Sequence, residues 1–138
     1  MNMTTPQEEI TLIIGHQQQA WNQGDAAGYA RDCDENMSFT NIVGKMFFGR
    51  EVFEERHSFL FSGIFQGSVL DMSIERIHFP MPKCAIVDIS CTLAGYQALP
   101  TGVSPQEDGA LHTCLLEVLV ETRNGWRVVA YHNVDKKL

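Results

Sequence analysis

The stretch that decides the fold is Gly125-Trp126-Arg127-Val128-Val129-Ala130-Tyr131-His132-Asn133. Asn124-Gly125 before it is a turn dipeptide, because glycine takes positive φ at no steric cost. The residues that follow alternate with a period of two, which predicts a long β-strand over Trp126–Asp135. One face of this strand carries Trp126, Val128, Ala130, His132 and Val134. That face is apolar except for one imidazole, so His132 either enters a pocket or is a satisfied core histidine.

Three more long strands are expected before this one, over Gly67–Phe79, Lys83–Tyr96 and Ala110–Thr122. In Lys83–Tyr96 the apolar face is the one with Ala85, Val87, Ile89, Cys91 and Leu93. In Ala110–Thr122 the nearly apolar face, predicted to point inward, carries His112, Cys114, Leu116, Val118 and Val120. The opposite, mixed face carries Thr113, Leu115, Glu117, Leu119 and Glu121. The long loop Gln97–Gly109 could act as a lid.

The first half of the chain predicts three helices and a short hairpin. Thr4-Thr5-Pro6 starts a helix that runs to about Gln23, and Asp25 caps a second helix through about Cys33. A third helix is expected over Arg50–Ser62. Between the second and third helices, Met37–Ile42 and Met46–Phe48 read as strands around a turn. Helices followed by strands predict a single α+β domain over residues 1–138, with the helices packed on a curved antiparallel sheet that encloses a cavity.

Composition excludes several classes of partner. The chain has 138 residues and a net charge of −7, which argues against nucleic acid and against an anionic membrane surface. No apolar run approaches the ~20 residues needed to span a bilayer, and no signal peptide is visible. We therefore expect a cytoplasmic protein whose four cysteines are reduced and buried.

Two further polar residues interrupt apolar surfaces. Gln17 falls within the apolar stripe of the first helix, which consists of Ile10, Ile13, Ile14 and Trp21. Asn41 shares a strand face with Met37 and Phe39. A polar side chain in such a place needs a partner or a wet cavity, although Gln17 could also lie at the edge of its stripe.

These segments together resemble the nuclear transport factor 2-like superfamily. The resemblance rests on Trp21-Asn22-Gln23-Gly24-Asp25, on Asn41-Ile42-Val43-Gly44, on Gly49-Arg50-Glu51 and on the closing strand. It covers nearly the whole chain and implies a cystatin-like cone. Within the superfamily, which includes SnoaL-like cyclases and ketosteroid isomerases, Ala130-Tyr131-His132-Asn133 looks most like the SgcJ/EcaC group. The fold hosts enzymes and inert modules alike, so the resemblance does not fix a function.

The resemblance also bears on the pocket. Where ketosteroid isomerases carry an aspartate base on the first strand, this chain has Asn41, and where they carry a tyrosine on the first helix it has Gln17. An amide cannot accept the proton that a carboxylate accepts, so that isomerase chemistry is not encoded here. The same alignment implies that Gln17 and Asn41 point toward the cavity.

We therefore predict that His132, Asn41 and Gln17 converge on one cavity between the first helix and the sheet. His132 is the candidate acid or base, and Gln17, Asn41, His112, Trp126 and Phe39 are the candidate ligand contacts. Two functions remain open: an acid–base enzyme without a cofactor, acting on a hydrophobic or polyketide-like molecule, or a binding or dimerisation module without catalysis. No metal motif and no nucleotide-binding motif is present in the sequence. A homodimer is expected, formed through an outer sheet face that includes Leu115, Leu119 and Tyr131.

Overall fold

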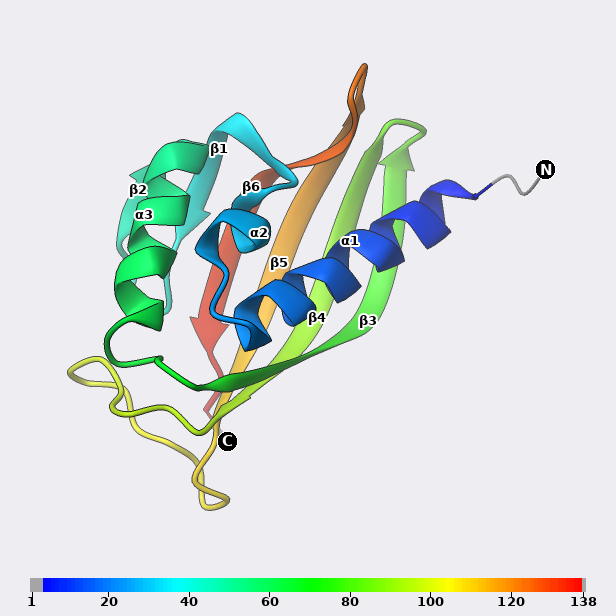
Figure 1. Cartoon of the computed structure of the whole chain (residues 1–138). Coiled ribbons are helices and arrows are strands. Elements are labelled where there is room, and N and C mark those ends of the chain that lie inside the picture. The colour runs from blue at the N-terminus through cyan, green and yellow to red at the C-terminus, as the bar shows by residue number, and fades with distance from the viewer. Residues whose placement is uncertain (1–3, 138) are drawn as a thin grey trace.

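The protein folds into three helices on one curved sheet (Figure 1), in a computed structural model that describes residues 4–137. The helices are α1 (Pro6–Asn22), α2 (Ala26–Ala30) and α3 (Arg50–Phe61). The strands are β1 (Cys33–Thr40), β2 (Met46–Phe48), β3 (Val69–Met81), β4 (Cys84–Ala94), β5 (Leu111–Thr122) and β6 (Gly125–Asp135). The predicted α+β class is confirmed, β2 has the predicted bounds, and the other elements begin and end at the predicted residues or within a few residues of them.

The sheet has the strand order β2-β1-β6-β5-β4-β3. Its neighbouring strands run antiparallel except for β1 and β6, which are parallel. The predicted antiparallel sheet is therefore a mixed one. Helix α3 and the meander of β3, β4 and β5 separate β1 from β6 in the chain, so no hairpin fixes their relative direction.

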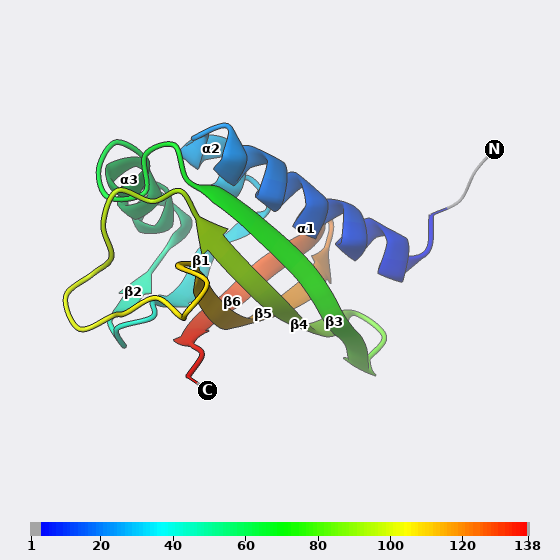
Figure 2. The same cartoon turned by 90° about the horizontal axis from the view of Figure 1, so that it is seen from below.

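The concave face of the sheet holds the core, and the helices cover it (Figure 2). Helix α1 begins at Pro6 because the Thr5 side chain accepts a hydrogen bond from the Glu8 backbone N–H over 3.1 Å. It buries Ile10 and Ile14, and α3 buries Phe53 and Phe61. These side chains meet the inner residues of β4, where Ala85, Val87, Ile89, Cys91 and Leu93 are buried as predicted.

A β-bulge in β6 decides which residues of that strand face the core. Val118 lies opposite Ala130, whereas Leu119 lies opposite Val128, so Val129 is an extra residue in β6. Because side chains alternate along a strand, one extra residue exchanges the two faces beyond it. Tyr131 is therefore buried and His132 is exposed. The prediction that His132 lies on the inner face is wrong for this reason.

The two faces of β5 are also the reverse of the prediction. Thr113, Leu115, Glu117 and Leu119 are buried, whereas Cys114 and Leu116 are exposed. The prediction assigned this face to the outside because it carries the carboxylate of Glu117 among residues that otherwise suit a core. Glu117 is tolerated there because it has a buried hydrogen-bond partner, Gln17. Leu115, Leu119 and Tyr131 consequently belong to the core and cannot form an outer dimer surface.

All four cysteines are free, and Cys33 and Cys91 are buried as expected, but Cys114 is exposed. Among residues 4–137, no helix is both long and apolar enough to cross a membrane.

Candidate functional site

A central cavity of about 70 Å³ opens between the concave face of the sheet and helices α1 and α3. This volume is enough for a few water molecules or part of a small ligand. Its walls are mostly apolar, and they come from α1, α3 and five of the strands. They consist of Trp21, Phe39, Asn41, Ile42, His57, Leu60, Phe65, Leu70, Cys91, Leu93, Leu111, Thr113, Tyr131 and Asn133.

His57 is the histidine of this cavity. It lies on α3, 3% exposed, and its ring centroid is 4.3 Å from that of Phe53 and 4.8 Å from that of Tyr29. Burial among aromatic rings lowers the pKa of His57 from 6.5 to about 4, so its imidazole is neutral at neutral pH. Nδ1 lies 2.8 Å from the Phe53 carbonyl oxygen and donates to it in the tautomer that satisfies both groups. Nε2 is then an acceptor in the wall of the cavity.

Two buried tyrosines join the cavity to the core beneath it. The hydroxyl oxygens of Tyr29 and Tyr131 lie 2.6 Å apart, and both side chains are almost completely buried. Burial, together with the neighbouring phenol and the Glu117 carboxyl, raises the pKa of Tyr29 well above 10. Burial likewise raises the pKa of Tyr131. Both phenols are therefore neutral, and one donates its proton to the other.

Two asparagines supply amide groups to the cavity. Asn41 follows β1 directly, and its Oδ1 accepts hydrogen bonds from the backbone N–H groups of Val43 and Lys45, at 3.1 and 3.0 Å. Its oxygen thus holds the turn before β2. Asn133 differs, because its Oδ1 is buried and has no hydrogen-bond partner among the described residues. An unsatisfied buried acceptor costs about 1–3 kcal/mol, so Asn133 is the polar group that a ligand would satisfy.

Glu117 on β5 lies opposite Tyr131 of β6 and is fully buried, at 0% exposed. Gln17 on α1 donates to its Oε1 over 2.9 Å. Its Oε2 has no partner among residues 4–137. Burial raises the pKa of Glu117 from 4.5 to about 7, against the lowering effect of the Gln17 hydrogen bond. The nearby carboxyl of Asp32 adds to the rise.

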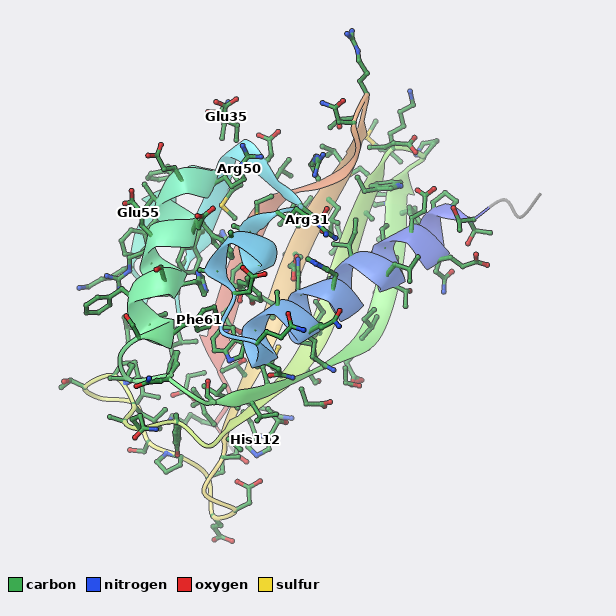
Figure 3. The ribbon with its side chains drawn as sticks, in the orientation of Figure 1. Arg31, Glu35, Arg50, Glu55, Phe61 and His112 are labelled. Carbon is green, nitrogen blue, oxygen red and sulfur yellow. The ribbon has the colours of Figure 1, made fainter. Side chains whose placement is uncertain are left out.

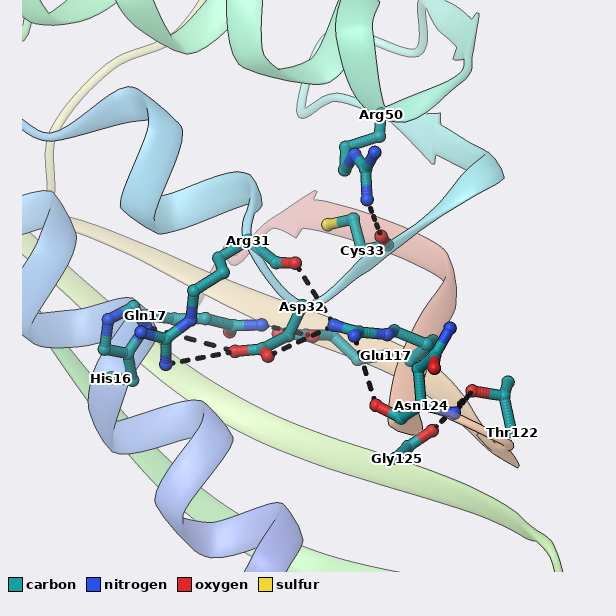
Figure 4. A network of polar contacts seen from close by, with 11 residues as sticks. His16, Gln17, Arg31, Asp32, Cys33, Arg50, Glu117, Thr122, Asn124 and Gly125 are labelled. Atoms are coloured by element: carbon teal, nitrogen blue, oxygen red, sulfur yellow. Dashed lines mark hydrogen bonds and ion pairs between the residues drawn. The ribbon is translucent and has the colours of Figure 1, made fainter.

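A second polar network encloses Asp32 (Figure 4). The Asp32 carboxylate lies 3.5 Å from the Arg127 guanidinium, 3.8 Å from that of Arg31 and 4.0 Å from Nδ1 of His16. Arg127 also donates to the backbone oxygens of Arg31 and Asn124, at 3.3 and 3.1 Å. These contacts join Arg127 of β6 to the Arg31-Asp32 segment before β1, so the network stabilises the start of β6, at the opposite end of that strand from Asn133.

The predicted site residues do not converge. Phe39 and Asn41 line the central cavity, but Gln17 lies outside its walls and binds Glu117. His132 is on the outer sheet face. The predicted meeting of His132, Asn41 and Gln17 is therefore wrong, and the bulge at Val129 is the reason for His132.

The other two predicted contacts also lie elsewhere. His112 lies near the start of β5, beside the loop that precedes it (Figure 3), and its Nε2 is 2.7 Å from Oδ2 of Asp108. Trp126 is 3% exposed at the opposite end of β6 from Asn133, and it packs edge-on against Phe79 with ring centroids 6.0 Å apart. Neither side chain lines the cavity.

Sequence reasoning missed four of the polar cavity residues: His57, Thr113, Tyr131 and Asn133. His57 was visible as part of the inner stripe of the third helix, where it falls four residues after Phe53. The other three lie on strand faces that were assigned to the outside. Within residues 4–137, no group of three or more His, Cys, Asp or Glu side chains is arranged to hold a metal ion.

Solved structures with the same fold are numerous. No protein-family model and no curated protein sequence matches the chain. A domain of unknown function with a cystatin-like fold from Nostoc punctiforme superimposes with a TM-score of 0.84 at 20% identity, over 99% of this chain and 81% of that one. A nuclear transport factor 2-like protein of unknown function from Shewanella oneidensis superimposes with a TM-score of 0.74 at 19% identity, over 95% of this chain and 100% of that one. A ketosteroid isomerase-like protein from Erwinia carotovora superimposes with a TM-score of 0.71 at 12% identity, over 94% of this chain and 95% of that one. The chain thus has the cystatin-like, nuclear transport factor 2-like fold.

Proposed function

We propose that the central cavity binds a small, mainly apolar molecule of aromatic or polyketide-like character. The observation that carries this proposal is the buried Oδ1 of Asn133, which has no partner among the described residues and belongs to an otherwise apolar wall. Apolar walls with a few placed polar groups are typical of small-molecule sites. Asn133 orients the ligand, and the hydroxyl of Tyr131 and Nε2 of His57 are further polar contacts.

Catalysis is the second candidate, and His57 is the residue that favours it. Its imidazole is neutral and lines the cavity, so it can accept a proton from a bound molecule. A pKa of about 4, however, makes His57 a weak base, several units below the value suited to work at neutral pH. Glu117 has a pKa of about 7 but does not line the cavity. Binding is therefore the primary proposal, and an acid–base enzyme is the alternative.

A neutral fluorescent probe, N-phenylnaphthylamine, tests ligand binding. Leu60 lies on α3 in the cavity wall and is only partly buried, so Leu60→Trp should block the cavity with little strain. We expect the wild-type protein to bind the probe and Leu60→Trp to weaken binding by about tenfold, which corresponds to ~1.4 kcal/mol. Leu12→Trp is the matched control, because Leu12 is 66% exposed on α1 and lies outside the cavity walls. Equal affinities in the three proteins would contradict the proposal.

The proposed assembly is a homodimer formed through the outer face of the sheet. Leu116 and Val134 are 36% and 60% exposed there, beside Cys114 and His132. An isologous contact between two such faces would cover these apolar side chains. Light scattering at micromolar concentration should give the mass of two chains for the wild type and of one chain for Leu116→Glu. A monomeric wild type would refute this assembly.

The proposed compartment is the reducing cytoplasm. The support is that all four cysteines are free. Thiol titration of the denatured protein, isolated without reductant, should find four thiols per chain. A count of two or none would point to an oxidising compartment.

A further inference from the structure

The central cavity continues into an outer groove. This groove, of about 480 Å³, lies between the turn after β1, helix α3 and the loop that follows β4. The cavity and the groove share Phe39, Asn41, Ile42, Leu60 and Phe65 as wall residues, so the groove is the mouth of the cavity. A ligand longer than the cavity would extend into it.

The charged residues of the groove wall are both cations, Lys45 and Arg56. Neither forms an ion pair with any residue in the part of the chain that the structure describes, although the chain carries a net charge of −7. Glu55, the neighbour of Arg56 on α3, points away from the body of the protein (Figure 3). Positive charge is thus concentrated at the mouth of the cavity in an acidic protein.

Aromatic rings hold Arg56 in place. Its guanidinium carbon lies 5.1 Å from the ring centroid of Phe47 and 5.9 Å from that of Phe59, which are cation–π distances. The Arg56 side chain makes no hydrogen bond to any residue between 4 and 137, so its guanidinium N–H donors remain available to a ligand. The charge of Arg56 also adds, after burial, to the lowering of the pKa of His57 in the cavity wall.

From these contacts we infer that the ligand is an amphipathic anion, with its apolar body in the central cavity and one carboxylate or similar group between Arg56 and Lys45. A planar guanidinium offers paired N–H donors that match the two oxygens of a carboxylate. The inference rests on the proposed ligand binding and adds the chemical class of the ligand. It also gives the ligand a direction, with the charged group outermost.

Two dyes that share one apolar body test the inference. Anilinonaphthalene sulfonate carries an anionic group that N-phenylnaphthylamine lacks, and each is titrated into the full chain by fluorescence. We expect the wild-type protein to bind the anionic dye about tenfold more tightly, the scale of one partly exposed charge-assisted contact. We expect Arg56→Gln and Lys45→Gln each to reduce this preference severalfold without weakening the binding of the neutral dye. Arg56→Lys, which keeps the charge but loses the paired N–H donors, should retain only part of it.

Arg123→Gln is the matched control, because it removes one positive charge from the exposed turn between β5 and β6, outside the groove. An equal loss of preference in Arg123→Gln would show that only net charge matters and would overturn the inference. Equal affinities of the wild type for the two dyes would overturn it too, while leaving ligand binding in place. Failure of both dyes to bind would overturn the proposed function itself.

Discussion

Replacing Glu117 with glutamine should expose a pH dependence of stability that the wild-type protein hides. The folded-state pKa of Glu117 is about 7 against 4.5 for an ordinary glutamate. The folded protein therefore binds a proton there that the unfolded chain releases. Its contribution to stability is fully present below pH 4.5 and is lost as the pH rises through about 7. A shift of this size corresponds to about 3 kcal/mol.

His57 acts in the opposite direction over nearly the same range. Its folded-state pKa of about 4 lies below the ordinary 6.5, so the unfolded chain binds the proton. Stability from this residue is lost as the pH falls from 6.5 through about 4, again by roughly 3 kcal/mol. Between pH 4.5 and 6.5 the two effects cancel, because folding in effect moves one proton from the imidazole to the carboxyl.

Urea denaturation across this range measures the result. The free energy of unfolding of Glu117→Gln should rise by about 3 kcal/mol between pH 4 and 6.5, and that of His57→Gln should fall by a similar amount between 4.5 and 7. Above pH 7, Glu117→Gln should be more stable than the wild type. Glu121→Gln, an exposed position on the same strand, is the control and should follow the wild-type curve. Parallel curves for all four proteins would contradict the buried proton.

Removing either hydroxyl of the tyrosine pair should cost about 1–3 kcal/mol of stability. Tyr29→Phe leaves the buried hydroxyl of Tyr131 without its partner at 2.6 Å, and Tyr131→Phe does the same to Tyr29. The double variant removes both groups, so it should lose less than the sum of the two single changes. Urea denaturation of the four proteins gives a coupling free energy that we expect to be about 1 kcal/mol or more.

Tyr96→Phe is the control for this cycle. The Tyr96 hydroxyl donates to the Gly109 carbonyl oxygen over 2.7 Å in a contact that is open to solvent. Water can replace that partner, so the loss should stay below about 1 kcal/mol. Strictly additive effects of Tyr29→Phe and Tyr131→Phe would show that the hydroxyls do not depend on one another.

The fold was predictable from the sequence because its signals are local. The cap at Thr5, the turn at Asn124-Gly125 and the two hydrophobic periods mark most elements to within a few residues. The direction of β1 relative to β6 was not predictable, because residues far apart in the chain set it. Phe39 and Asn41 were correctly placed at the cavity, since the alternation of β1 from Met37 to Phe39 continues to Asn41, the first residue after the strand.

The rest of the site depends on contacts between elements, which the sequence of a single strand does not reveal. A bulge is defined by the pairing of two strands, so the extra residue Val129 has no signature in β6 alone. Glu117 is acceptable in the core only because Gln17, 100 residues earlier, reaches it. Both errors therefore have one physical origin: the sequence shows what each residue prefers, and the tertiary structure supplies the partner that overrides the preference.

The bulge at Val129 sets which side chains of β6 face the cavity. With Val129 bulged, β6 presents Tyr131 and Asn133 to the interior. If Val129 instead paired regularly with Val118, the alternation continued from Val128 would present His132 and Val134. A point mutation changes one lining group at a time, but a change of Val129 from bulged to regular pairing would exchange a phenol and an amide for an imidazole and an isopropyl group in one step. Deletion of Val129 removes the extra residue itself, so we expect it to straighten β6 while Tyr131 and Asn133 still face the cavity.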